Sequence, residues 1–265
     1  MRAVTLLYHD LVEGGKYAES GFCSPDANIY KLEASLYEDH LRAIAKTFGC
    51  KATAADAALT TGWSGRPFFL TFDDGGSSAL KLTAPLLERF GHVGHFFIST
   101  DFIGQPGFMK APEIRELRAR GHVIGSHSCS HPPRMSRCSA AEIEREWRDS
   151  VNTLADIISE PIHTASVPGG YYSHAVAAAA EKAGIAVLFN SEPTIRVRRI
   201  GNCLVTGRFS VQQGVTLDTV LAFAGARWTA LARQSLYWNT KKALKAMGGD
   251  YWLKARKLLL ARSAR

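Results

Sequence analysis

Short apolar stretches alternate along the chain with longer stretches in which apolar residues recur every three or four positions. This alternation is typical of repeated βα units. The predicted strands are Val4 to Tyr8, Phe68 to Phe72, Gly94 to Ile98, Val123 to Ile124, Thr164 to Val167 and Ala186 to Phe189, with a further pair at Cys203 to Thr206 and Arg208 to Val211.

The predicted helices occupy the segments between these strands. The segment from Ser139 opens with Ser139-Ala140-Ala141-Glu142, which is the Ser-x-x-Glu form of a capping box. Gly184 is placed to end the alanine-rich helix before it. The predicted helices are Leu36 to Phe48, Ser78 to Phe90, Ala111 to Arg120, Ser139 to Ile158, His174 to Ala183 and Asp218 to Leu231.

Roughly six to seven βα units in about 225 residues favour an α/β fold with a distorted (β/α) barrel of about seven strands. The pattern also allows a doubly wound open sheet. In both architectures the active-site groups follow the carboxyl ends of the strands. We assign residues 1–225 to one catalytic barrel and residues 226–265 to a helical tail.

Composition narrows the class of protein and the compartment. Of the 265 residues, 46% are hydrophobic and 21% charged, as in ordinary globular proteins. Five cysteines form no Cys-x-x-Cys pair, and the first residues lack the long apolar run of a signal peptide, so we expect a cytoplasmic protein. Ten Lys or Arg and one acid lie in residues 227–265, whereas the rest of the chain is near neutral, so the net charge of +8 predicts no nucleic-acid binding.

Two adjacent carboxylates follow the second predicted strand, in Thr71-Phe72-Asp73-Asp74-Gly75. Asp-Gly is a common turn signal, so an acidic turn is one interpretation. Two acids side by side at a buried strand end repel each other, however, and a cation would relieve that repulsion. Alone, the segment leaves both interpretations open.

A pair of histidines follows a later strand, in Gly125-Ser126-His127-Ser128-Cys129-Ser130-His131. The i, i+4 spacing brings two imidazoles to one point if the loop coils by a helical turn. Imidazole together with carboxylate is the usual ligand set for zinc and related divalent ions. One aspartate and two histidines at strand ends therefore indicate a metal site.

These two segments resemble the first two motifs of the polysaccharide deacetylases, the family with the NodB homology domain (carbohydrate esterase family 4). Gly94-His95-Phe96-Phe97-Ile98 also resembles the strand between the motifs in that family, and the resemblance covers roughly residues 1–215. It implies a NodB-like distorted barrel and one divalent metal ion, zinc in most members and cobalt, nickel or iron in others. By motif position the ligands would be Asp74, His127 and His131, and Asp73 would be the general base toward the attacking water.

The third motif of the family is altered. Its Arg-Pro-Pro-Tyr-Gly-like stretch corresponds to Ser166-Val167-Pro168-Gly169-Gly170-Tyr171, with Ser166 where the arginine would stand, and it is more similar to the version in exopolysaccharide deacetylases. The resemblance implies that the Gly169 N–H stabilises the oxyanion, and that Pro168 and Tyr171 line the substrate site. A plain Pro-Gly-Gly turn is the alternative.

The late motifs, including the usual general-acid histidine, are missing. Leu6-Leu7-Tyr8-His9-Asp10 resembles the Tyr-His-Asp opening of members with circularly permuted motifs, which makes His9 the candidate acid. Packing at the barrel rim is the alternative role for His9. Asp10 would orient His9 or line the cleft, and Arg208 would steady the rim or a substrate oxygen.

The basic tail from 226 to 265 also carries tryptophans and leucines. One interpretation is helices whose apolar side packs on the barrel. The other is peripheral contact with an anionic membrane. The sequence predicts no oligomeric state.

The leading hypothesis is a metal-dependent hydrolase that removes N-acetyl groups from an amino-sugar unit of a polysaccharide or glycan precursor, as in exopolysaccharide biosynthesis. Hydrolysis of another non-peptide C–N bond, of the ureide or cyclic imide type, is a second hypothesis. A third is a glycan-binding pseudoenzyme, suggested by Ser166 and the missing motifs.

Overall fold

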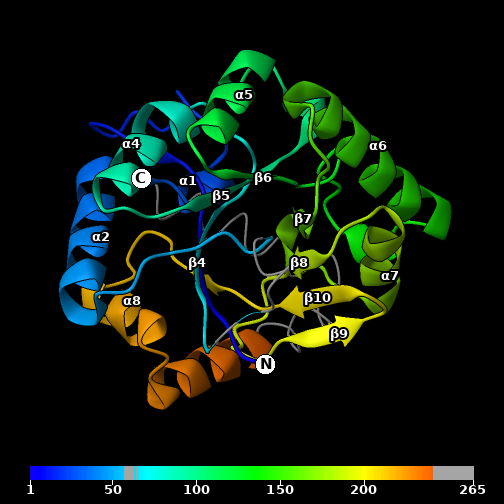
Figure 1. Ribbon diagram of the computed structural model, residues 1–265. Coiled ribbons are helices and arrows are strands. Elements are labelled where there is room, and N and C mark those ends of the chain that lie inside the picture. Colours follow the sequence, from blue (N-terminus) through cyan, green and yellow to red (C-terminus); the bar gives the residue numbers. More distant parts are fainter. Residues whose placement is uncertain (57–62, 64, 241–265) are drawn as a thin grey trace.

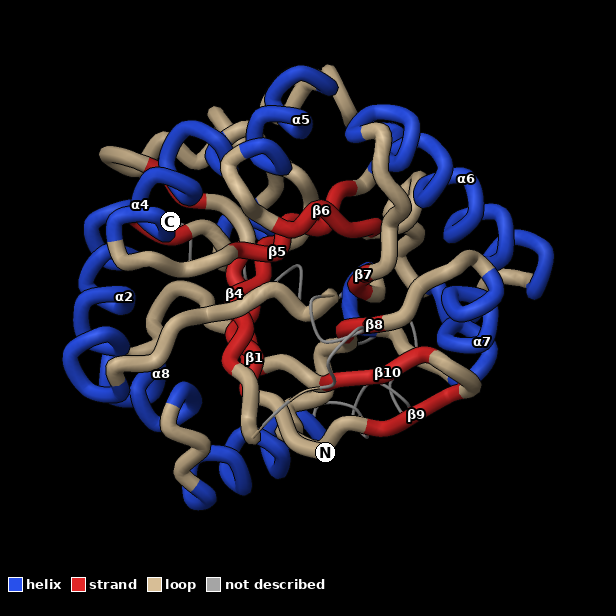
Figure 2. The backbone as a smooth tube through the Cα atoms, in the orientation of Figure 1, coloured by secondary structure: helices blue, strands red, loops and turns tan. Residues whose placement is uncertain are grey.

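The computed structural model describes residues 1–56, 63 and 65–240. Its strands run along the centre of the molecule, and the helices form an outer ring around them (Figures 1 and 2). The strands are β1 (Val4–Tyr8), β2 (Leu11–Val12), β3 (Leu32–Glu33), β4 (Phe68–Phe72), β5 (Gly94–Ile98), β6 (Val123–Ser126), β7 (Thr164–Ser166), β8 (Val187–Phe189), β9 (Arg198–Ile200), β10 (Cys203–Thr206) and β11 (Phe209–Ser210).

Apart from the short helix Pro25–Asn28, which was not predicted, the helices lie in the predicted segments. Ser139 caps α6 with the predicted capping box, and Gly184, with φ of +89°, follows α7. The helices are α1 (Pro25–Asn28), α2 (Ala34–Phe48), α4 (Ala84–Arg89), α5 (Ala111–Ala119), α6 (Ala140–Ile158), α7 (His174–Lys182) and α8 (Leu217–Ala224). Short turns of other helical types are η1 (Ala79–Thr83, a π-helical turn), η2 (Thr100–Phe102), η3 (Met135–Arg137) and η4 (Pro168–Gly170).

One nine-stranded sheet has the order β11-β1-β4-β5-β6-β7-β8-β10-β9, and only its edge strand β9 is antiparallel to its neighbour. Strand β10 pairs with β8, and after two residues the chain continues as β11, which pairs with β1. The bend between them is at Gly207, where a Cβ atom would lie 2.1 Å from the carbonyl oxygen of Glu192. Counting β10 and β11 as one bent strand gives the seven parallel strands of the expected distorted barrel, so the fold prediction is confirmed. Strands β2, β3 and β9 were not predicted.

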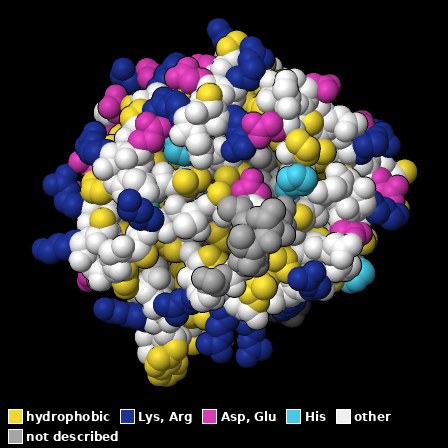
Figure 3. All heavy atoms as spheres, viewed as in Figure 1, with side chains coloured by type: hydrophobic (Ala, Val, Ile, Leu, Met, Phe, Trp, Pro, Cys, Tyr) yellow, Lys and Arg dark blue, Asp and Glu magenta, His cyan; other side chains and the backbone are white. Residues whose placement is uncertain are grey.

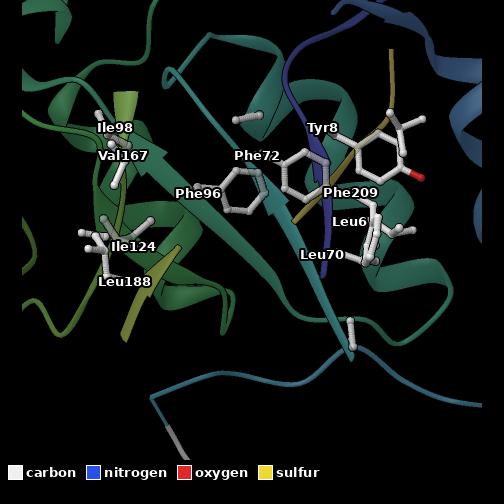
Figure 4. Packing of buried hydrophobic residues seen from close by; sticks show 14 of the residues in the cluster. Leu6, Tyr8, Leu70, Phe72, Phe96, Ile98, Ile124, Val167, Leu188 and Phe209 are labelled. Carbon is white, nitrogen blue, oxygen red and sulfur yellow. The ribbon is translucent and has the colours of Figure 1, made fainter. Parts of the chain in front are cut away.

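Two cores lie on the two faces of the sheet. Alternate side chains of each strand pack outward against the helices, and Figure 4 shows Tyr8, Phe72 and Phe96 in a row from neighbouring strands. Their rings stack with centroids 5.8 and 5.0 Å apart. The intervening side chains fill the barrel interior, where Phe69 and Phe189 pack together. This packing fixes the positions of the strand ends, where the site lies.

The C-terminal helix prediction is interrupted: α8 ends at Ala224, and a second helical stretch covers residues 228–240. Ala230 and Leu231 of this stretch pack against the core, and Ser235 donates a hydrogen bond to the Pro193 carbonyl at 2.9 Å. Its outer face exposes Trp228 and Leu236. Hydrophobic and basic side chains share the edge of the molecule where this stretch lies (Figures 1 and 3).

The described start of the tail thus packs on the barrel, while residues 241–265 lie outside the described part of the chain. None of the helices described is long and apolar enough to cross a membrane. Membrane contact through the tail stays a prediction.

Candidate active site

Residues from four strand ends meet at one end of the barrel. His9 follows β1, Asp73 and Asp74 follow β4, and His127 follows β6, while Ser166 ends β7. Because these strands are parallel, their carboxyl ends lie at the same edge of the sheet. Groups that are far apart in sequence are thereby brought together.

The predicted metal ligands Asp74, His127 and His131 form one cluster. One ligand atom of each lies within 4.8 Å of the others. Asp74 Oδ1 is 3.5 Å from the Nε2 atom of His127 and 3.6 Å from that of His131. A carboxylate and two imidazoles converging in this way are a typical donor set for a divalent ion.

The electrostatics of the cluster also fit a cation. Burial raises the pKa of Asp74 well above its ordinary value, and the neighbouring carboxylates Asp73 and Asp10 raise it further. Burial lowers the pKa of His127 to about 3 and also lowers that of His131, so both imidazoles are neutral at pH 7. Neutral imidazole is the form that binds metal, and a positive ion would relieve the repulsion at Asp74.

The backbone at these ligands is strained. Asp74 has φ of 80° and His131 has φ of 53°, and Ser128 between the two histidines has φ of 64°. Left-handed conformations of this kind cost non-glycine residues energy and persist only where the surroundings enforce them. Such strain is common at functional sites, and here it lies on two of the three predicted ligands.

Asp73 is fixed by three donors. The Arg208 guanidinium donates to both of its oxygens, Nη1 to Oδ1 at 2.7 Å and Nη2 to Oδ2 at 2.8 Å, and Ser166 Oγ donates to Oδ1 at 3.0 Å. Burial alone would raise the pKa of Asp73, but Arg208, with a smaller contribution from His127, more than offsets this and holds the pKa below its ordinary range. Asp73 is therefore ionised at neutral pH.

The predicted place of Arg208 at the rim or on a substrate oxygen is wrong. Its side chain is 1% exposed, its Nε donates to the Asn190 carbonyl at 3.1 Å, and its guanidinium lies over the Phe97 ring, 5.9 Å from the centroid. The bend at Gly207 directs it into the barrel beneath Asp73. Arg208 thus supplies from the last strand the guanidinium that Ser166 cannot supply from the third motif.

Ser166 connects the base to a ligand. The Nδ1 atom of His127 donates to the Ser166 carbonyl at 3.0 Å and lies 2.5 Å from its hydroxyl, which in turn donates to Asp73. With its proton on Nδ1, His127 presents the Nε2 lone pair toward Asp74. The serine therefore sets the tautomer that metal binding requires.

His9 lies beside this cluster, and its ring packs at an angle against the Tyr30 ring with centroids 4.6 Å apart. Its Nδ1 atom is buried and makes no hydrogen bond within the described residues. Burial lowers the pKa of His9 to about 4, while the charge of Asp73 opposes that effect. The structure thus places His9 beside the base and the predicted ligands, and its role as acid stays a prediction.

Asp10 does not line a cleft, contrary to one predicted role. It is 4% exposed and accepts hydrogen bonds from the hydroxyls of Ser20 at 2.5 Å and Ser78 at 2.8 Å. A Cβ atom on Gly76 would lie 1.9 Å from Asp10 Oδ1. Asp10 instead joins the loop after β1 to the segment that follows Asp73 and Asp74.

The segment with Pro168, Gly169 and Tyr171 follows β7 at the same end of the barrel. Gly169 has φ of +58° within the short turn, and a Cβ atom there would lie 3.2 Å from the Tyr171 ring. Pro168 is buried and Tyr171 is half-buried. The backbone forms the Pro-Gly-Gly turn that was the alternative interpretation of this segment. The roles of these residues toward substrate stay predictions.

Sequence reasoning missed Glu146 of α6. Its carboxylate is 5% exposed and accepts hydrogen bonds from the backbone N–H groups of Cys129 and Ser130, both at 2.9 Å. In the sequence it is one of several acids on an amphipathic helix, and only the buried side of that helix distinguishes it.

Comparison with known proteins finds polysaccharide deacetylases among the similar sequences. The family model of the polysaccharide deacetylases matches residues 63–188. The Bacillus subtilis protein YxkH, named as a polysaccharide deacetylase, is 22% identical over 192 residues, which are 71% of this chain and 64% of that protein. A chitooligosaccharide deacetylase of Rhizobium leguminosarum bv. trifolii is 26% identical over 195 residues, covering 61% of this chain and 85% of the relative. The chain thus spans less than two thirds of the length of YxkH.

Solved structures share the fold. Streptococcus pyogenes deacetylase PplD superimposes with a TM-score of 0.70 at 16% identity, covering 84% of this chain and 98% of that one. The de-N-acetylase from Aggregatibacter actinomycetemcomitans gives a TM-score of 0.68 at 18% identity, with 84% and 100% covered. The family model thus identifies a polysaccharide deacetylase domain in residues 63–188, and the barrel has the fold of solved deacetylases.

Proposed function

We propose that this protein hydrolyses the N-acetyl group of an amino-sugar unit in a glycan. One observation carries the proposal: an ionised carboxylate, Asp73, is held by an arginine fork directly beside a cluster of one aspartate and two histidines. The names of the relatives, polysaccharide and chitooligosaccharide deacetylases, support the substrate class.

Asp74, His127 and His131 would hold the metal ion. Such an ion supplies a Lewis acid that polarises the acetyl carbonyl and lowers the pKa of water. The donor set is compatible with zinc and with cobalt, nickel or iron.

Asp73 would accept the proton of the attacking water at Oδ2. Each carboxylate oxygen has about two acceptor positions, and on Oδ1 both are used by Arg208 and Ser166. Oδ2 takes one donor, from Arg208, and it faces His127 with Nε2 3.8 Å away. The free lone pair on Oδ2 is thus the basic position nearest the ligand cluster.

His9 would deliver to the departing amine the proton that the attacking water gave up, since burial keeps its own ring neutral at pH 7. The water oxygen bonds to the carbonyl carbon, the C–N bond breaks, and the nitrogen leaves as an amine once it has gained a proton; the products are acetate and the free amino sugar. The Gly169 N–H would stabilise the negative charge on the carbonyl oxygen. The negative charge of Asp73 acts on His9, so the two side chains lie close together. A base and an acid that act on the same amide bond must be close in this way.

The main argument for a pseudoenzyme no longer holds. Ser166 suggested a site without the arginine that steadies the base, but Arg208 binds Asp73 through both oxygens. Hydrolysis of a ureide or imide has no structural feature that favours it over deacetylation.

The test is acetate release from N-acetylated chitooligosaccharides and other acetylated glycans, measured together with bound metal. We expect one divalent ion per chain, activity that a chelator removes and added metal restores, and loss of turnover in Asp73→Asn with metal content intact. Asp39→Asn, an exposed position on α2, is the matched control. Unchanged turnover in Asp73→Asn, or no acetate from any acetylated sugar, would refute the proposal.

A further inference from the structure

The loop from His127 to His131 carries two of the three predicted ligands, and each of its backbone N–H groups has a partner. His127 donates to the Ile98 carbonyl at 2.9 Å. Two serine hydroxyls accept two more N–H groups: Ser126 Oγ, just before the loop, accepts from Ser128 at 3.1 Å, and Ser128 Oγ accepts from His131 at 3.2 Å. The two central donors, from Cys129 and Ser130, are bound by one carboxylate from outside the loop.

That carboxylate is Glu146. Its Oε2 atom accepts both central N–H groups at 2.9 Å, and its Oε1 atom accepts the Ser130 hydroxyl at 2.7 Å. One turn later on α6, Ser150 Oγ lies 2.7 Å from Ser126 Oγ, which binds the N–H of Ser128. Because residues four apart share a helix face, α6 presents both groups to the loop together.

The loop needs this support because its backbone is strained. Ser128 and His131 have φ of 64° and 53°, a conformation that is unfavourable for non-glycine residues and persists only where the surroundings enforce it. The three hydrogen bonds to Glu146 hold the backbone between these two residues in place.

We propose that Glu146 is a positioning residue for the metal centre, which fixes the backbone between His127 and His131 so that both imidazoles face Asp74. This inference rests on the proposed function, because it concerns the same centre. Among the described residues the hydrogen bonds of the Glu146 carboxylate go to Cys129 and Ser130, between the two histidines, so it acts on the main chain that carries them.

The surroundings of Glu146 allow the proposal to be tested by removing the side chain. A cavity of about 370 Å³ borders the carboxylate, lined mainly by polar residues that include Thr100, Asp101 and Asp149. With alanine at 146, water in this cavity can bind the two freed N–H groups, so no buried donor is left without a partner. The barrel should fold while the loop loses its fixed conformation.

The experiment measures the affinity of the purified full-length protein for Zn²⁺ alone, by competition with a chelator. Glu146→Ala should weaken binding about 10- to 100-fold, the range seen when partners of metal ligands are removed. Glu146→Gln keeps a carbonyl oxygen for the two N–H groups and should stay within about threefold of wild type. Glu144→Ala is the control: it lies on α6 like Glu146, it removes only an exposed ion pair with Lys182 of α7, and it should leave the affinity unchanged.

Cobalt substitution provides a second readout. The visible spectrum of the Co²⁺ form reports ligand geometry, so Glu146→Ala at saturating Co²⁺ should differ from wild type while Glu146→Gln should match it. The melting temperature in excess chelator checks that each variant is folded before metal is added.

The outcomes separate this inference from the proposed function. Wild-type affinity in Glu146→Ala would overturn it, and so would an equal loss in Glu146→Gln and Glu146→Ala, because charge rather than loop geometry would then be responsible. A protein that binds Zn²⁺ with the expected pattern of variants but releases no acetate would overturn the proposed function and leave the role of Glu146 standing.

Discussion

The two sides of the site differ in how firmly their reactive groups are held. Asp73 receives three hydrogen bonds, two from a fully buried arginine and one from Ser166. His9 has a ring that packs at an angle against Tyr30 and a buried Nδ1 atom for which the described residues offer no hydrogen-bond partner. Asp73 is buried and His9 partly buried, and polar contacts fix the first while ring packing positions the second.

This difference indicates the protonation state and the hydrogen bonding of each group before substrate binds. The partners of Asp73 hold its pKa below the ordinary range, so the base is ionised at neutral pH before any substrate arrives. Burial holds the pKa of His9 at about 4, so its ring is neutral and has bonding capacity left. The protein alone provides the hydrogen-bond partners of Asp73, whereas a partner for His9 Nδ1 has to come from a molecule that binds beside it.

Of the variants considered, removal of Arg208 should have the largest effect on turnover and stability, because it takes away the contacts that fix the base. Arg208→Ala leaves Asp73 as a buried charge without a partner, which costs about 3–5 kcal/mol of unfolding free energy. Burial then raises the pKa of Asp73, so we expect turnover to fall by about 10³-fold or more, with Arg208→Lys between the two because an ammonium lacks the planar fork. Urea unfolding and acetate release measure the two effects.

The control for Arg208 is a second arginine fork of similar geometry. Arg120 donates to both oxygens of Glu88 at 2.8 Å, but the two side chains are 28% and 37% exposed. Exposed pairs contribute about 0–1 kcal/mol, so Arg120→Ala should cost no more than that. Similar losses in the two variants would mean that burial of the Asp73 pair carries no weight.

His9→Gln should lower kcat by about 10²–10⁴-fold, the usual contribution of a general acid. Stability should hardly change, because Nδ1 forms no hydrogen bond that the mutation could break. An aryl acetate ester has a leaving group that needs no proton, so its hydrolysis should be spared in His9→Gln and lost in Asp73→Asn. His163→Gln, at an exposed position, serves as the control; equal losses on the amide and the ester would exclude His9 as the acid.

The ligand cluster and the base could be predicted from sequence because each lies directly after a strand. In a parallel barrel, position after a strand already implies the same end of the molecule, so Asp73, Asp74 and His127 were expected to meet. The motifs themselves are local, and their residue types limit the chemistry. Strand order brings these residues together, while the division of roles between Asp73 as base and Asp74 as ligand comes from the family resemblance.

The partners of these groups could not be predicted, since they depend on three-dimensional packing. Arg208 reaches Asp73, 135 positions away in the chain, because one strand bends at Gly207 from β8 to β1. Glu146 is one of several acids on α6, and only its burial against the loop separates it from the solvated ones. For Asp10 the sequence left two roles open, orienting His9 and lining the cleft, and only the folded loops show that serines enclose it.

His95 is a buried histidine that, unlike His9, has hydrogen-bond partners, so it can be compared with His9. Its pKa is also about 4 because of burial, but its Nε2 accepts the Ala55 N–H at 2.9 Å and its Nδ1 lies 3.3 Å from the Leu70 carbonyl. The folded state therefore disfavours protonation, and stability present above pH 6.5 is lost as the pH falls from 6.5 through 4. From pH 7.5 to pH 5 this one group should cost about 2 kcal/mol of unfolding free energy.

The measurement is urea unfolding at both pH values for wild type and His95→Gln. The variant should lose about 2 kcal/mol less than wild type over this range, with turnover per folded molecule little changed. An identical pH dependence would show that His95 does not stay neutral in the folded protein.

Ser166→Ala should have the smallest effect on the base side, because Arg208 still binds both oxygens of Asp73. The variant removes one hydrogen bond to a charged group, so we expect kcat/KM to fall roughly tenfold, at the low end of the 1.5–3 kcal/mol for such bonds. The backbone carbonyl of residue 166 still accepts the Nδ1 proton of His127, so metal affinity should stay near wild type. Ser210→Ala, which removes a hydroxyl without a hydrogen-bond partner among the described residues, is the control. A loss in Ser166→Ala larger than that in Arg208→Lys would mean that the serine, rather than the arginine, holds the base.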